Sequence, residues 1–254
     1  MSSARDYLIK EGIDSYFDLD QHSDYQEQPH DSVNGKLSIP FPPDLEDLAR
    51  IHQIVRKRKC FTILEFGLGL SSIVMADALM KNKMEFDKLD QKPKLRNNFM
   101  FKLFSVDSNK KWIEHTSNNF PNELKQFITF HQSDVTIGTF NDRICHYYDN
   151  LPDIVPDFIY LDGPSPKDVK GSINGLSFQC DERTVMSADI LKMESVLLPG
   201  TYILVDGRTN NARFLQHNFQ RNFEIIWDKE ADITSFELNE ERLGKYNILG
   251  YDFL

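Results

Sequence analysis

The sequence predicts an α/β fold built on one mostly parallel β-sheet with helices on both of its faces. Short apolar runs, typical of buried parallel strands, alternate with longer segments that have helical periodicity. Several of these runs end in an acidic residue, as expected where strands open onto loops at one edge of a sheet. At 254 residues, of which 40% are hydrophobic, the chain is long enough to bury one large core.

The N-terminal part is predicted to hold one regular helix. Residues 1 to about 36 are polar without sustained periodicity, so we expect a mobile arm or short helices there. Pro40 to Pro43 stops any helix, and Asp44 to Arg58 restarts one, because its apolar residues recur on a single face. We therefore treat residues 1–58 as an N-terminal extension and helix, and residues 59–254 as the main domain.

The most informative segment is ILEFGLGLSS, which ends at Ser72. Cys60 to Phe66 has the length and apolarity of a buried strand, and Ile73 to Leu79 continues with helical periodicity. Gly67 and Gly69 lie at the turn between them. Glycine allows positive φ and close approach of a ligand, and the helix that follows presents free N–H groups. The segment predicts a cradle for a nucleotide-like ligand, with a simple tight turn as the alternative.

The remaining elements follow in alternation. Further strands are predicted at Phe101 to Val106, Phe127 to Phe130, Pro156 to Asp162, and in LLPGTYILVD. Helices are predicted to begin in VDSNKKW and to occupy Thr184 to Leu198 and Asn210 to Phe219. A strand at Phe223 to Trp227 and the alternating segments ITSFEL and YNILGYDF are predicted to close the sheet with an antiparallel hairpin. Lys83 to Asn98 is interpreted as a polar insertion.

The turn from Glu65 to Gly69, E-x-G-x-G, resembles motif I of class I S-adenosylmethionine-dependent methyltransferases. Nicotinamide-binding turns have a third glycine, and this chain has Ser72 at that position. A carboxylate suits a ligand that carries an ammonium and a sulfonium, whereas it would repel a pyrophosphate. The resemblance covers roughly Phe61 to Leu254. It implies a Rossmann-like, doubly wound, seven-stranded sheet and S-adenosylmethionine as cofactor.

The resemblance also assigns roles to residues at strand ends. Asp107 would accept hydrogen bonds from both ribose hydroxyls, and Asp134 with the N–H of Val135 would hold the adenine. PDFIYLD resembles motif IV, which places Asp162 at the methyl-transfer site. Ser38 to Phe41 is a candidate cover for the cofactor. The expected cofactor-binding residues are Glu65, Gly67, Gly69, Ser71, Ser72, Asp107, Ser108, Asp134 and Val135, and the expected catalytic residue is Asp162.

Methyl transfer from an activated sulfonium requires the protein mainly to align the acceptor and to remove its proton. Candidates for the base or orienting group are Asp162, Asp206 and His146. Metal-dependent members of the family have an Asp-Asn pair after the fifth strand, but Gly207 follows Asp206 here, so no metal ligand is predicted. The loop from Gly163 to Arg183 is long enough to be a lid, with lysines that could receive an anionic acceptor, or else a solvated surface loop.

The composition limits the classes of partner and of site that we expect. The net charge of −10 argues against a nucleic-acid substrate, and three widely spaced cysteines argue against a disulfide framework or a structural zinc site. No apolar stretch has transmembrane length, and we expect a cytoplasmic protein. The predicted function is O-methylation of a small-molecule or sugar-type acceptor. A non-catalytic nucleoside- or partner-binding protein and a dinucleotide-dependent oxidoreductase are the alternatives, and the oligomeric state is not predicted.

Overall fold

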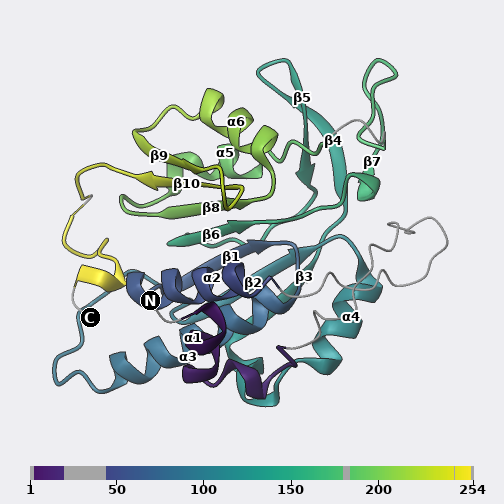
Figure 1. The fold of residues 1–254 in the computed structure, drawn as a ribbon. Helices are drawn as coiled ribbons and strands as arrows, with labels where there is room; N and C mark the ends of the chain where they lie inside the picture. The colour runs from purple at the N-terminus through teal and green to yellow at the C-terminus, as the bar shows by residue number, and fades with distance from the viewer. Residues whose placement is uncertain (1–2, 20–43, 180–183, 243, 253–254) are drawn as a thin grey trace.

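A seven-stranded sheet forms the centre of the molecule in the computed structural model, which describes residues 3–19, 44–179, 184–242 and 244–252 (Figure 1). The strand order is β3-β2-β1-β6-β8-β10-β9. All pairings are parallel except those of β10, which runs antiparallel to both β8 and β9. The strands are β1 Thr62–Phe66, β2 Lys102–Asp107, β3 Ile128–Gln132, β6 Phe158–Leu161, β8 Tyr202–Asp206, β9 Phe223–Asp228 and β10 Ile233–Leu238. The predicted mostly parallel sheet and its antiparallel C-terminal hairpin are confirmed.

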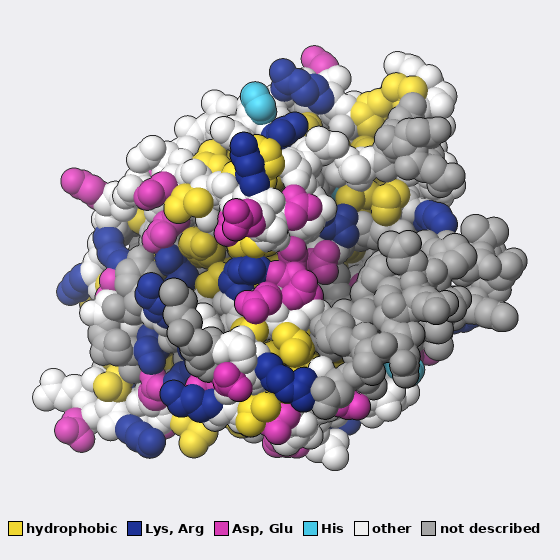
Figure 2. Space-filling model, in the orientation of Figure 1, with side chains coloured by type: hydrophobic (Ala, Val, Ile, Leu, Met, Phe, Trp, Pro, Cys, Tyr) yellow, Lys and Arg dark blue, Asp and Glu magenta, His cyan; other side chains and the backbone are white. Residues whose placement is uncertain are grey.

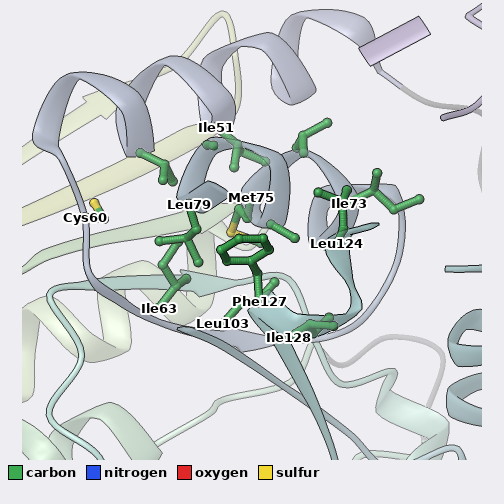
Figure 3. Close-up of a cluster of buried hydrophobic side chains, with 14 of the residues drawn as sticks. Ile51, Cys60, Ile63, Ile73, Met75, Leu79, Leu103, Leu124, Phe127 and Ile128 are labelled. Carbon is green, nitrogen blue, oxygen red and sulfur yellow. The ribbon is translucent and has the colours of Figure 1, made fainter. Parts of the chain in front are cut away.

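Helices cover both faces of this sheet because its inner strands are apolar on both sides. Ile63 of β1 packs into one hydrophobic cluster with α1 Ala4–Lys10, α2 Leu45–Arg58 and α3 Leu70–Asp87 (Figure 3). Leu64, the next residue, packs on the opposite side with α5 Asp189–Met193 and α6 Thr209–Asn218. The helix α4 Lys110–Asn119 contacts β3 at the edge of the sheet.

The N-terminal residues share the core of the main domain. Leu8 of α1 and Ile13 are fully buried in the same cluster as Ile63, and the predicted helix at α2 is present with Asp44 as its N-cap. The Asp44 side chain accepts hydrogen bonds from the backbone N–H groups of Glu46 and Asp47, as an N-cap does. The division of the chain at residue 58 remains a prediction, and the proposed cofactor cover at residues 38–41 lies outside the described residues.

The predicted helix from Thr184 to Leu198 is wrong in its first half. Residues before Asp189 are extended against β5 Arg143–Tyr148: the N–H of His146 donates to the carbonyl of Met186 at 2.9 Å, and the N–H of Ala188 donates to the carbonyl of His146 at 3.1 Å. The helical periodicity of this segment is therefore overridden by pairing with a strand. Only α5 and a short 3₁₀ helix, Glu194–Val196, are helical.

That strand belongs to a second sheet that the sequence reading missed. Its order is β5-β4-β7, with β4 Val135–Phe140 and β7 Val169–Lys170, so part of the predicted lid loop is a strand. Asn141 and Asp142 join β4 to β5 with φ of 48° and 60°. Asn and Asp tolerate positive φ, and such a pair between two alternating runs is typical of a two-residue hairpin turn. This pair is the sequence signal that could have revealed the hairpin.

Two smaller expectations also need correction. The described part of YNILGYDF, residues 246–252, does not form a strand; the hairpin consists of β9 and β10, and Gly250–Asp252 is a 3₁₀ turn. Gly250 is required there, because a Cβ would lie 1.9 Å from the carbonyl oxygen of Lys59 at the end of α2. The predicted polar insertion at Lys83 to Asn98 is partly helical, since α3 continues to Asp87.

Candidate functional site

A pocket of about 950 Å³ opens where β1, β2, β6 and β8 end. Each of these strands contributes its C-terminal acid or the residue beside it, so chain segments far apart in sequence meet at one edge of the sheet. Figure 2 shows acidic side chains gathered near the centre of this face of the molecule. Besides the strand ends, the glycine turn, α2, α4 and the N-terminal residues Tyr16 and Phe17 line the pocket.

The turn after β1 needs glycine at one of its two predicted positions. Gly67 has φ of +108°, and a Cβ there would lie 3.2 Å from the backbone nitrogen of Gly163. Gly69 is extended, with φ of −177°, and a Cβ there would meet no protein atom within 4 Å. The chain's own packing thus explains Gly67, whereas Gly69 borders open pocket space at the start of α3.

Glu65 is fully buried beneath this turn. The hydroxyls of Ser71 and Ser72 donate to its two carboxylate oxygens at 2.5 and 2.6 Å, and Ser105 on β2 donates as well. Burial raises the pKa of Glu65 to about 7, against the lowering effect of the three hydroxyl donors. Glu65 therefore links β1 to β2 and to the first turn of α3 through hydrogen bonds. The hydroxyls of both predicted serines, Ser71 and Ser72, donate to this carboxylate.

Asp107, at the end of β2, lines the pocket as expected. Its Oδ1 accepts the N–H of Asn109 at 2.7 Å, and burial raises its pKa to about 6. Beside it stands Trp112 of α4, whose indole N–H donates to the carbonyl of Leu68 at 2.7 Å and whose ring stacks on His115. Sequence reasoning missed Trp112, because its place at the glycine turn depends on how α4 packs.

Asp162 follows β6 and faces the same pocket. Its side chain is 56% accessible, but that surface looks into a recess, and desolvation there raises its pKa to about 7. The guanidinium of Arg208 opposes this rise, with Nε 3.7 Å from Oδ1 of Asp162, and donates to the carbonyls of Asp162 and Pro164. Arg208, at the start of α6, was not predicted from the sequence.

Asp206 ends β8 and also lines the pocket. The hydroxyl of Tyr160 donates to its Oδ2 at 2.5 Å. Burial raises the pKa of Asp206, while the hydrogen bond from Tyr160 lowers it. Two neighbouring parallel strands therefore present a pair of carboxyl groups, Asp162 and Asp206, to one cavity.

Other predicted site residues are placed elsewhere. Asp134 and Val135 do not line the pocket: the Asp134 carboxylate lies 2.6 Å from Nζ of Lys170, and Val135 is buried at the start of β4. Ser108 donates to Asp168, which does line it. The candidate base His146 is fully buried outside the pocket, and burial lowers its pKa to about 3.

Acidic side chains of the described pocket lining are not balanced there by lysine or arginine. Its described lining contains seven carboxyl side chains and no lysine or arginine; the seven are Asp44, Asp47, Glu65, Asp107, Asp162, Asp168 and Asp206. Within the described residues no group of three or more His, Cys, Asp and Glu side chains is arranged to hold a metal ion. No helix in the same ranges is long and apolar enough to span a membrane.

No protein-family model matches this sequence, and no curated protein matches it. Solved structures match this chain in fold. TomG, an O-methyltransferase from Streptomyces achromogenes in complex with SAM, is 13% identical, with 78% of this chain and 82% of that chain covered and a TM-score of 0.40. SAH-bound methyltransferase PaMTH1 from Podospora anserina is 11% identical, with the same coverages and a TM-score of 0.44. A putative O-methyltransferase from Klebsiella pneumoniae is 13% identical, with coverages of 93% and 90% and a TM-score of 0.42.

Proposed function

We propose that this protein is an S-adenosylmethionine-dependent methyltransferase of class I that acts on a small-molecule acceptor. The observation that supports the proposal best is the pocket itself. The glycine turn, the acid that ends β2 and the acid that follows β6 line one cavity, and its described lining contains no lysine or arginine. A ligand with an ammonium and a sulfonium suits this field, whereas the pyrophosphate of a dinucleotide would be repelled by it.

In this proposal, different pocket residues bind different parts of the cofactor. Asp107 accepts the ribose hydroxyls, and the indole of Trp112 offers an apolar face to the adenine. The free N–H groups at the start of α3, beside Gly69, suit the carboxylate of the methionine part. Glu65 acts indirectly, since it fixes the turn through Ser71 and Ser72. Asp134, Val135 and Ser108 are left with no contact to the pocket.

Bound S-adenosylmethionine supplies an activated methyl group, so the chain's own task is to align the acceptor and to take its proton. Asp162 is suited to this, because a carboxyl group with a pKa of about 7 is a stronger base than an ordinary aspartate and is still ionised in part at neutral pH. A hydroxyl acceptor is proposed on this ground. A cytoplasmic location is a further part of the proposal. So is the absence of a nucleic-acid partner, which the net charge of −10 supports.

Isothermal titration calorimetry with S-adenosylmethionine, S-adenosylhomocysteine and NAD tests the proposal. We expect the first two to bind and NAD to bind at least about tenfold more weakly, because the pocket lining is acidic and would repel its pyrophosphate. Tighter binding of NAD would overturn the assignment. Binding of S-adenosylmethionine without turnover of any acceptor, in a screen of hydroxylated metabolites and nucleotide sugars, would favour the non-catalytic alternative.

A further inference from the structure

Arg208, the N-cap residue of α6, holds the loop that follows β6. Its side chain is 19% exposed and is not part of the pocket lining. One Nη donates to the carbonyl of Asp162, and the other donates to the carbonyl of Pro164 at 3.1 Å. The guanidinium therefore binds the loop on both sides of Gly163. Arg208 reaches this loop from the end of β8, which is the neighbour of β6 in the sheet (Figure 1).

The third nitrogen of this guanidinium lies near the carboxylate of Asp162. Nε of Arg208 is 3.7 Å from Oδ1 of Asp162, and it is buried with no hydrogen-bond partner among the described residues. Buried donors are nearly always hydrogen-bonded, and this distance is slightly too long for a hydrogen bond. A small shift of the carboxylate toward Nε would form a charge-assisted bond, which is stronger to an ionised Asp162 than to a protonated one.

The charge of Arg208 acts chiefly on Asp162. Within the described residues, Arg208 forms an ion pair with Asp162 and with no other acid. Two buried side chains of β5 lie near enough to be affected by its charge, but both are neutral at pH 7: burial lowers the pKa of His146 to about 3 and raises the pKa of Tyr148. At Asp206 the effect of Arg208 on the pKa is smaller than that of burial.

From these contacts we propose that Arg208 is a positioning residue for Asp162: it fixes the loop that carries this carboxyl group and holds the ionised carboxylate at the pocket. The inference rests on the proposed function, in which Asp162 takes the proton of the acceptor. Arg208 acts through Asp162 and not on the ligand, because it does not line the pocket. Arginine suits this role, since its planar group can bind two carbonyls and a carboxylate together, whereas lysine has a single nitrogen.

Removal of Arg208 should make Asp162 harder to ionise. Burial is the main cause that raises the pKa of Asp162 to about 7; Arg208 opposes this rise, and Asp206 and Asp47 add to it. Without Arg208, the carboxyl group would be left among acids. The titratable and charged groups that interact with it come from five elements, and they are Glu65 of β1, Tyr160 of β6, Asp206 of β8, Asp47 of α2 and Arg208 of α6.

The titration of Asp162 tests the proposal on the full chain without any acceptor. Aspartate carboxyl carbons are isotope-labelled, the Asp162 signal is assigned by its loss in Asp162→Asn, and NMR gives its midpoint in the unmodified chain, Arg208→Gln and Arg208→Lys. Arg213→Gln is the matched control, because Arg213 is an exposed residue of the same helix and does not line the pocket. In the unmodified chain, the Nε–H signal of Arg208 is followed across the same pH range.

We expect the Asp162 midpoint to rise by at least about 1 pH unit in Arg208→Gln, and to change by less than about 0.3 in Arg213→Gln, whose charge is screened by solvent. Arg208→Lys keeps the charge, so its midpoint should lie below that of Arg208→Gln. The Nε–H signal of Arg208 should titrate with the midpoint of Asp162 and should lose this response in Asp162→Asn. This last measurement decides the question even if Arg208→Gln does not fold.

No rise in Arg208→Gln, an equal rise in Arg213→Gln, equal midpoints in the two Arg208 variants, or an Nε–H signal that does not follow Asp162 would each overturn the inference. Failure of the proposed function gives a different result. If S-adenosylmethionine does not bind in calorimetry while the titrations behave as expected, the methyltransferase assignment is overturned and the control of Asp162 by Arg208 stands.

Discussion

At the scale of single residues, Asp107 gives the sharpest test of the cofactor assignment. Replacing it with alanine removes a carboxylate that would accept charge-assisted hydrogen bonds from the ribose, so we expect Asp107→Ala to weaken S-adenosylmethionine by about 2 kcal/mol, roughly 30-fold. Calorimetry measures this. Asp153→Ala is the control, because Asp153 is exposed and does not line the pocket. An unchanged dissociation constant in Asp107→Ala would remove this residue from the cofactor site.

Asp162 separates direct base catalysis from metal assistance. Arg208 lies beside the carboxylate of Asp162, and the hydroxyl of Tyr160 donates to the carboxylate of Asp206. A divalent cation would therefore have to displace a partner from each of the two acids. We expect Asp162→Asn to lower turnover on the order of 100-fold, because the amide cannot accept the proton. Activity should persist in EDTA. Loss of activity in EDTA that Mg²⁺ restores would instead make Asp162 and Asp206 metal ligands.

We expect His146 to lower the free energy of unfolding relative to an apolar residue at the same position. Because its buried ring nitrogens have no hydrogen-bond partner among the described residues, we expect His146→Phe to raise the free energy of unfolding by about 1 kcal/mol at pH 7. Burial lowers the folded-state pKa of His146 to about 3, below the ordinary value of 6.5, so the unfolded chain takes up this proton first. The stability that depends on a neutral His146 is present above about pH 6.5 and is lost as the pH falls toward 3.

Urea unfolding at pH 7 and pH 5 tests both statements about His146. The difference in stability between the two pH values should be smaller in His146→Phe than in the unmodified chain. A lower stability of the variant at pH 7 would show that the imidazole has a partner, such as a fixed water molecule, in the free protein.

At the scale of elements, a buried polar chain holds the N-terminal helix on the main domain. Burial lowers the pKa of His52, so its ring is neutral; Nε2–H donates to Oδ2 of Asp77 at 2.8 Å, and Nδ1 accepts the hydroxyl of Tyr7 at 2.7 Å. Lys81 lies 2.7 Å from the same Asp77 oxygen. The hydroxyl of Tyr16, a residue of the pocket wall, donates to the other oxygen at 3.2 Å. α1, α2 and α3 are thereby linked to the site.

We expect Tyr7→Phe to lower the free energy of unfolding by about 1 to 2 kcal/mol, because it leaves Nδ1 of His52 buried without a donor. Chemical denaturation of the unmodified chain and of the variant measures this difference in the free energy of unfolding. Tyr202→Phe is the matched control, since no hydrogen bond is assigned to the Tyr202 hydroxyl within the described residues, and its effect should be smaller. Equal effects of the two variants would show that the hydroxyl of Tyr7 contributes nothing beyond its ring.

The elements that the sequence predicted correctly are those whose patterns are local. Strands such as β1 and β6 are continuous apolar runs bounded by turn residues, and their acids reach the pocket because parallel strands end at one edge of a sheet. The helix prediction fails from Thr184 to Ala188 because pairing with β5 outweighs the helical pattern of this segment. Trp112 and Arg208 carry no local signal, since their contacts with Leu68 and Asp162 depend on how α4 and α6 pack.

At the scale of the whole molecule, the pocket concentrates negative charge that the fold partly suppresses. Burial raises the pKa of Asp47 to about 6, of Asp107 to about 6 and of Asp162 to about 7, and Asp206 adds to the rise at both Asp47 and Asp162. Because these folded-state values lie above the ordinary value of 3.8, the carboxyl groups hold protons near pH 6 that the unfolded chain would have released.

A cationic cofactor should therefore bind more tightly as the pH rises. A positive charge favours the ionised carboxylates, so binding of S-adenosylmethionine below about pH 7 should release protons, and its affinity should increase from pH 5.5 to about pH 7 and then level off. Calorimetry across this range gives the affinity, and titration in two buffers with different ionisation enthalpies gives the number of protons released. Asp107→Asn should bind more weakly and release fewer protons at pH 6 than the unmodified chain. An affinity that is constant or falls across this range would mean that cofactor binding does not favour the ionised forms of the buried carboxyl groups, and would leave the acidic lining without the role assigned to it.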